Sequence, residues 1–79
     1  MIVRINPRRS NVYSQADAEA CLRAYQIDPD HPDARDLERV VLDIAGMQVG
    51  DGFLRRFLAL SCVVKIIGAN AAQLERLSS

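Results

Sequence analysis

The chain has 79 residues, which suffices for one domain but would leave two domains without adequate cores. Its hydrophobic content of 49% and charged content of 25% exclude a disordered protein. The formal net charge of zero excludes a protein that binds nucleic acid or anionic membranes through its overall charge.

The charges are unevenly distributed along the chain. Residues 1–13 contain three arginines and no acid, residues 14–46 contain eight acids and three arginines, and residues 47–79 contain four basic residues and two acids. The middle of the chain is therefore acidic. Nine of the ten basic residues are arginine, which indicates a GC-rich coding sequence of bacterial or phage origin.

The first six residues have the alternation that is typical of a short strand. Val3 and Ile5 alternate with Arg4 and Asn6, and Pro7 ends the pattern. A single strand must pair with a second copy of the chain, with the sheet edge of a partner, or with nothing. We expect an extended arm and loop over residues 1–13.

The next two segments predict helices. Ser14 and Asp17 have the spacing of a capping box, and the helix that follows should stop at Asp28 because Pro29 disfavours helical backbone before it. A second helix is expected from near Pro32 to Gly46. Its apolar face contains four large side chains, Leu37, Val40, Val41 and Ile44.

The predicted third helix, residues 52 to about 67, is apolar around nearly its whole circumference. A fourth short helix is expected after Asn70, its capping residue. The fold prediction is all-α: one domain, residues 1–79, with a small bundle of three main helices plus a short C-terminal helix over 14–79 and a β-like extended N-terminal arm.

The stretch "DPDHPD", residues 28–33, is the most polar candidate for chemistry. A calcium loop would need glycine where Asp33 stands and glutamate where Arg39 stands. One histidine with no cysteine nearby falls short of a zinc site. We therefore interpret the stretch as a turn that ends one helix and begins the next, and we predict no metal site, no catalytic residues, no cofactor and no enzymatic activity.

The two cysteines, Cys21 and Cys62, lie in predicted helices and lack metal-site spacing. We expect both to be buried and reduced; a disulfide between them is the alternative.

Two short stretches resemble known families. "ACLRAYQIDPDHPDA", residues 20–34, resembles the junction between tetratricopeptide repeats at Ala24, Ile27, Asp28 and Pro29, which implies an antiparallel helix pair. The N-terminal strand followed by helices resembles ribbon-helix-helix repressors, which pair strands across a dimer in the DNA major groove. That resemblance implies a DNA-binding regulator as an alternative function, with base and phosphate contacts from Arg4, Asn6, Arg8 and Arg9.

The preferred functional hypothesis is a non-enzymatic protein–protein interaction module, such as a small inhibitor or adaptor. The over-apolar third helix predicts a homodimer or other homo-oligomer that associates through Phe53, Leu54, Phe57, Leu58, Val63 and Ile66. A basic partner would bind an acidic face formed by Asp30, Asp33, Asp36, Glu38 and Asp43. The alternative is that this face is only a solvated surface without a partner. The sequence indicates no small-molecule substrate and no membrane segment, and it predicts a cytoplasmic protein.

Overall fold

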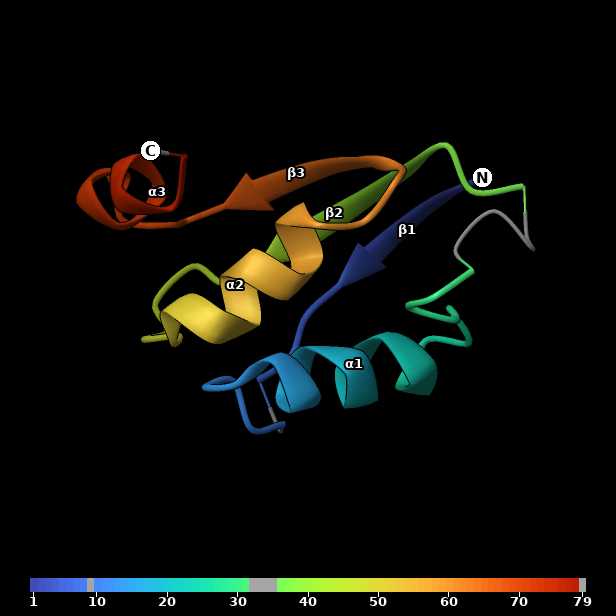
Figure 1. Ribbon diagram of the computed structural model, residues 1–79, viewed down its shortest axis with the longest axis horizontal. Coiled ribbons are helices and arrows are strands. Elements are labelled where there is room, and N and C mark those ends of the chain that lie inside the picture. Colours follow the sequence, from blue (N-terminus) through green and yellow to red (C-terminus); the bar gives the residue numbers. More distant parts are fainter. Residues whose placement is uncertain (9, 32–35, 79) are drawn as a thin grey trace.

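The computed structural model describes residues 1–8, 10–31 and 36–78 of the chain. Strands and helices alternate along the sequence (Figure 1), in the order β1 (Ile2–Ile5), α1 (Gln15–Ala24), β2 (Arg39–Asp43), α2 (Asp51–Leu58), β3 (Val63–Ile67) and α3 (Ala71–Ser78). The protein is an α/β domain with a parallel sheet, so the all-α prediction is wrong.

The strands form a parallel sheet in the order β1-β2-β3. Val40 of β2 lies opposite both Val3 and Val64, which sets the register. Parallel neighbours require a crossover connection, and α1 and α2 provide the two crossovers. Because each crossover advances one strand in the same direction, right-handed connections put both helices on one face of the sheet. Figure 1 shows α1 and α2 on that common face.

The hydrophobic core lies between this covered face of the sheet and the two helices. The Phe53 and Phe57 rings of α2 have centroids 5.0 Å apart and are fully buried. The remaining buried apolar side chains of the described residues lie between residues 5 and 60: Ile5, Val12, Ala18, Cys21, Leu22, Ile27, Val40, Leu42, Ile44, Leu54 and Leu60.

The N-terminal strand is present, and it pairs with β2 of the same chain over Ile2–Ile5. The side of β1 towards β2 is therefore already hydrogen-bonded. The strand pairing across a dimer that the ribbon-helix-helix resemblance implies does not apply to that side.

The second predicted helix is replaced by strand β2. Leu37, Val40, Val41 and Ile44 have helical spacing, but Leu42 makes residues 40–42 a continuous apolar run. Such a run is also typical of a strand in a parallel sheet, and periodicity alone does not distinguish the two in a short segment. Here β2 is the central strand, and pairing on both sides decides the outcome.

The third predicted helix divides into α2 and β3. Helical structure ends at Leu58, and β3 begins at Val63. Four of the five residues of "VVKII" are β-branched, which favours a strand. A segment that looks apolar on all sides of one helix is thus an amphipathic helix followed by a strand.

Local capping predictions are confirmed at two helices. Ser14 Oγ accepts a hydrogen bond from the Asp17 backbone at 3.2 Å, and Asp17 Oδ2 accepts from the Ser14 backbone at 3.1 Å. Asn70 Oδ1 accepts from the Ala72 backbone at 2.8 Å at the start of α3. Helix α1 ends at Ala24, earlier than the predicted Asp28, because Gln26 takes a left-handed conformation with φ of 62°.

Candidate functional site

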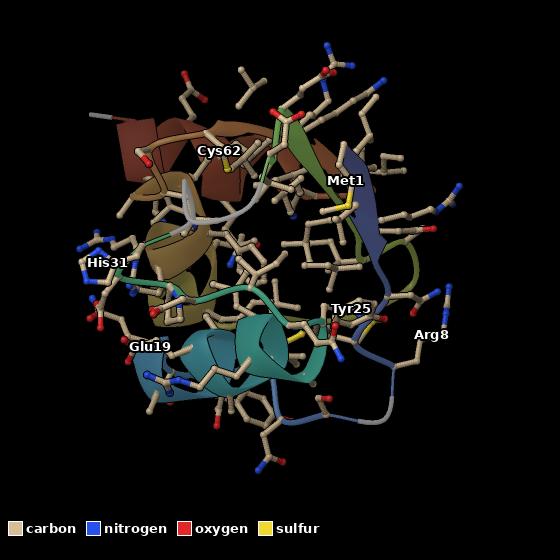
Figure 2. The ribbon with its side chains drawn as sticks, turned by 90° about the vertical axis from the view of Figure 1, so that its right-hand side faces the viewer. Met1, Arg8, Glu19, Tyr25, His31 and Cys62 are labelled. Carbon is tan, nitrogen blue, oxygen red and sulfur yellow. The ribbon has the colours of Figure 1, made fainter. Side chains whose placement is uncertain are left out.

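The face of the sheet opposite α1 and α2 is open to solvent in the described part of the chain. Figure 2 views the molecule from the amino ends of the strands, with both helices on one side of the sheet. Helix α3 lies beyond the carboxyl ends of the strands rather than over this face (Figure 1). Parallel sheets are normally covered on both faces. An open face in a parallel sheet is therefore a candidate binding surface.

The strand register arranges the open face in three rows. The first row is Ile2, Arg39 and Val63, the second is Arg4, Val41 and Lys65, and the third pairs Asp43 with Ile67. We call these eight residues the open sheet face. Ile2 and Val63, the first residues of β1 and β3, are 59% and 60% exposed, a large fraction for aliphatic side chains in a strand.

One ion pair crosses the open sheet face. Arg4 Nη2 lies 2.6 Å from Asp43 Oδ2, and the Ala45 backbone N–H donates to Asp43 Oδ1 at 3.2 Å. The Arg4 guanidinium, followed by the Ala45 amide, holds the pKa of Asp43 below its ordinary value. Asp43 is therefore ionised at neutral pH and neutralises Arg4.

Two further cations of this face have no such partner. The side chains of Arg39 and Lys65 make no hydrogen bond or ion pair with the residues that the structure describes. The open sheet face thus carries three cations against one carboxylate, beside exposed aliphatic groups. Its chemistry is apolar and basic.

The predicted acidic face is not assembled as one surface. Asp43 lies on the open sheet face and Asp30 lies 3.5 Å from Arg56 of α2, on the opposite side of the sheet. The amino terminus donates to the Asp36 carbonyl oxygen at 2.7 Å and lies 3.8 Å from Glu38 Oε1. Asp33 is outside the described residues. The carboxylates of Asp30, Glu38 and Asp43 therefore have three different partners.

The residues predicted for self-association separate into buried and exposed groups. Phe53, Leu54 and Phe57 are fully buried inside the protomer and are not available to a second copy. Ile66 is half-buried on the covered face, in register with Leu42. Leu58 and Val63 are exposed, at 44% and 60%, on different elements. Self-association through Leu58 or Val63 stays a prediction.

The residues of the alternative DNA-binding hypothesis have partners within the chain or are undescribed. Arg4 is paired with Asp43, and Arg8 donates to the Ala45 carbonyl oxygen at 3.1 Å. Asn6 is exposed, and its backbone N–H donates to the Tyr25 hydroxyl at 3.1 Å. Arg9 lies outside the described residues.

The stretch at residues 28–31 forms a turn. Asp28 Oδ1 accepts from the Asp30 backbone at 2.9 Å, and the His31 backbone N–H donates to the Asp28 carbonyl oxygen at 3.2 Å. In the described ranges no group of three or more His, Cys, Asp or Glu side chains could hold a metal ion. The turn interpretation is confirmed for residues 28–31. The predicted helix start near Pro32 lies outside the described residues, and the next element that the structure describes is strand β2.

Cys21 and Cys62 do not form a disulfide, which confirms the predicted reduced state, whereas the predicted burial is confirmed for Cys21 alone. Cys21 is buried in the core and Cys62 is half-buried before β3. Burial raises the pKa of the Cys21 thiol, so this side chain is an unreactive part of the core.

Sequence reasoning missed Arg39, Lys65, Ile2 and Ile67 as members of one surface. The usable signal was the alternation in "VVKII", where Val63, Lys65 and Ile67 share a face only in a strand. The helical interpretation hid that pattern.

Comparison of the chain with protein families, with curated proteins and with solved structures finds no match. None of the helices in residues 1–8, 10–31 and 36–78 is both long enough and apolar enough to cross a membrane.

Proposed function

We propose that this protein is a non-enzymatic protein–protein interaction domain that binds its partner on the open sheet face. The observation that supports the proposal is the exposure of Ile2 and Val63 beside two cations, Arg39 and Lys65, that no described side chain neutralises. In the isolated domain, these aliphatic groups and unneutralised cations are exposed on the sheet without contributing to its stability. Both groups gain interactions when a complementary surface covers them.

The occupant that fits this face is an acidic amphipathic helix of a partner protein. Helices are the usual cover of parallel sheets, and an apolar stripe would contact Ile2, Val63 and Ile67. Carboxylates beside that stripe would pair with Arg39 and Lys65. The strands are five residues long at most, so the face extends about 16 Å along them, a distance that about 11 helical residues cover.

Charge disfavours the two other occupants. A second copy that met this face with its own would bring the cations Arg39 and Lys65 of both copies together. A DNA duplex would bury aliphatic side chains against phosphates, while Arg4 is already neutralised by Asp43. A protein with an apolar and acidic surface satisfies both kinds of group.

Titration with designed peptides tests the proposal. The probe is a 14-residue Leu/Glu amphipathic helix with blocked ends, and its matched control has lysine at every glutamate position. Amide shift changes in NMR spectra should concentrate in residues 39–43 and 63–67 for the acidic peptide only. Binding should weaken with added salt, because ion pairs at an exposed rim are screened.

Two variants locate the site. Val63→Asp and Lys65→Glu should each weaken the binding of the acidic peptide. Arg55→Glu changes an exposed residue of α2 on the other side of the sheet and should leave the affinity unchanged. Equal binding of both peptides would contradict the proposal, as would shifts confined to α1 and α2. Dimerisation at a protein concentration of tens of micromolar, made stronger by Lys65→Glu, would contradict the proposal and assign the face to a second copy. Tight binding of a DNA duplex would assign the face to nucleic acid.

A further inference from the structure

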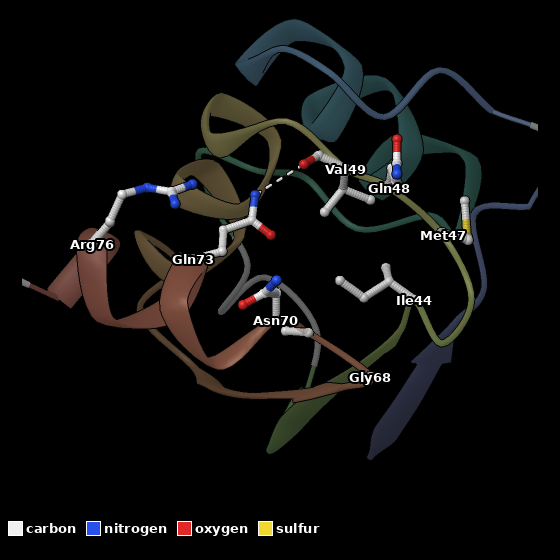
Figure 3. A pocket seen from close by; sticks show the side chains of 9 residues that line it. Ile44, Met47, Gln48, Val49, Gly68, Asn70, Gln73 and Arg76 are labelled. Atoms are coloured by element: carbon white, nitrogen blue, oxygen red, sulfur yellow. Dashed lines mark hydrogen bonds between the residues drawn. The ribbon is translucent and has the colours of Figure 1, made fainter.

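A cavity of about 430 Å³ lies at the carboxyl end of the sheet, away from the open sheet face. It separates the segment after β2, residues 44–49, from the segment that leads from β3 into α3, residues 68–76 (Figure 3). The volume is within the range of small-molecule sites.

Two amide side chains direct unused hydrogen-bonding groups into this cavity. Asn70 Oδ1 is occupied by the Ala72 backbone at 2.8 Å, which leaves the Asn70 Nδ2 group as a donor. Gln73 Nε2 donates to the Val49 carbonyl oxygen and to Asp51 Oδ1, both at 2.9 Å, which leaves Gln73 Oε1 as an acceptor. Figure 3 shows both amides turned towards the space between the two segments. Their contacts within the protein thus fix which end of each amide is available.

The charges near the cavity neutralise each other. Arg76 Nη2 lies 3.1 Å from Asp51 Oδ1. Hydrogen bonds from Gln73, followed by Arg76, hold the pKa of Asp51 below its ordinary value, so the carboxylate is ionised and balances the guanidinium. The site therefore offers no excess of either sign to a charged ligand.

The rest of the lining combines apolar and polar groups. Ile44 is buried, Met47, Val49 and Ala69 are half-buried, and Gln48 is an exposed lining residue. A small ligand in the cavity therefore meets polar groups as well as aliphatic ones, and the methionine thioether adapts to its shape.

We infer that this cavity binds a small neutral ligand that presents a cis-amide edge. Such an edge places a carbonyl oxygen beside an N–H, as in primary carboxamides, lactams and pyrimidine-type imides. Asn70 Nδ2 donates to the ligand carbonyl, and Gln73 Oε1 accepts from the ligand N–H. The inference does not depend on the proposed function, because it concerns a different edge of the domain.

Three related compounds test the chemistry of this site by NMR titration. Benzamide has the complete edge, N,N-dimethylbenzamide lacks the N–H, and benzoate replaces the amide by a charge. Benzamide should bind with a dissociation constant on the order of millimolar, as expected for so small a ligand. It should shift the amide signals of residues 44–49 and 68–73 and the side-chain amide signal of Asn70. The two analogues should bind at least about threefold more weakly, since each loses a hydrogen bond.

Asn70→Asp is the decisive variant, because it keeps the oxygen that accepts from Ala72 and removes the donor. Its affinity for benzamide should fall about threefold to tenfold, the effect of one hydrogen bond. Asn11→Asp introduces the same charge at an exposed residue that does not line the cavity, and it should leave the affinity unchanged. Equal binding of benzamide and N,N-dimethylbenzamide, unchanged affinity in Asn70→Asp, or no shifts at about 20 mM benzamide would each overturn the inference.

Discussion

Two glycines with nearly the same backbone conformation distinguish the observed fold from the all-α prediction. Gly46 has φ of +78° and Gly68 has φ of +83°. In the all-α prediction both glycines follow the end of a helix, and alanine would cost the same at each. In the α/β fold a Cβ at Gly46 meets nothing within 4 Å. A Cβ at Gly68 would overlap Ala45 Cα and lie 2.7 Å from Ala45 N.

The expected magnitudes follow from these surroundings. Left-handed backbone costs a residue with a Cβ about 1–2 kcal/mol, and this is the whole cost of Gly46→Ala. Gly68→Ala adds a clash with backbone at the carboxyl ends of β2 and β3, which brings the total to about 2–5 kcal/mol. The difference between the variants isolates the close approach of residues 45 and 68.

Urea unfolding followed by circular dichroism measures both variants. For a domain of this size the slope is about 1 kcal/mol/M, so the Gly68→Ala midpoint should be at least about 1 M below that of Gly46→Ala. A domain this small has a free energy of unfolding of only about 4–12 kcal/mol. The expectation is therefore also met if the Gly68→Ala variant is unfolded without urea while the Gly46→Ala variant is folded. Free energies of unfolding equal to within about 0.5 kcal/mol would refute the packing of β3 beside the end of β2.

Three further predictions concern the core, the ion pair and the thiols. Phe57→Ala should lower the free energy of unfolding, measured with urea, by about 3–5 kcal/mol. The neighbouring Leu58→Ala should lower it by less than about 1 kcal/mol, because only the phenylalanine is buried. Similar losses for the two variants would contradict the orientation of α2. Arg4→Met removes the main cause of the low pKa of Asp43. A carboxylate with a lowered folded-state pKa stabilises the fold above its unfolded-state pKa and loses this effect as the pH falls through the folded-state value. The urea midpoints of wild type and variant should therefore differ at pH 7 and converge as the pH falls below 3.8, and a constant difference would argue against the pair. Cys62 should react with a thiol reagent in the native state and Cys21 only after unfolding, as mass spectrometry of the labelled chain would show; equal rates would contradict the burial of Cys21.

The predictions that succeeded depend on contacts between near neighbours in the sequence. The Ser14–Asp17 capping box and the Asn70 cap join residues two or three positions apart, so the sequence contains both partners of each bond. The turn at Asp28 is of the same kind. The strand at residues 2–5 was recognised from its alternation, although its pairing partner was not.

The predictions that failed concern segments whose partners are distant in the sequence. Residues 39–43 and 63–67 are apolar runs that satisfy a helical or a strand pattern equally, and their hydrogen bonds join positions more than 20 residues apart. Each segment has a pattern that fits a helix when it is considered alone, and only the pairing of both with β1 in one sheet makes them strands. These two assignments account for the wrong fold class.

The candidate surfaces show the same division. The acidic residues 30–43 looked like one face because they are close in sequence, but Asp30 is paired with Arg56 and Asp43 with Arg4. Conversely, Arg39, Val63 and Ile2 looked unrelated, and the parallel register places them in one row. No local pattern carries that information.

The sequence by itself determined the start of α1 and α3, the strand at the N-terminus and the turn at residues 28–31. Each of these depends on hydrogen bonds or backbone preferences within a few residues. Only the tertiary structure decided the identity of β2 and β3, the open sheet face and the cavity beside Asn70 and Gln73. The reason is that a parallel strand obtains its backbone hydrogen bonds from strands brought to it by a crossover, so its conformation is settled by the sheet as a whole.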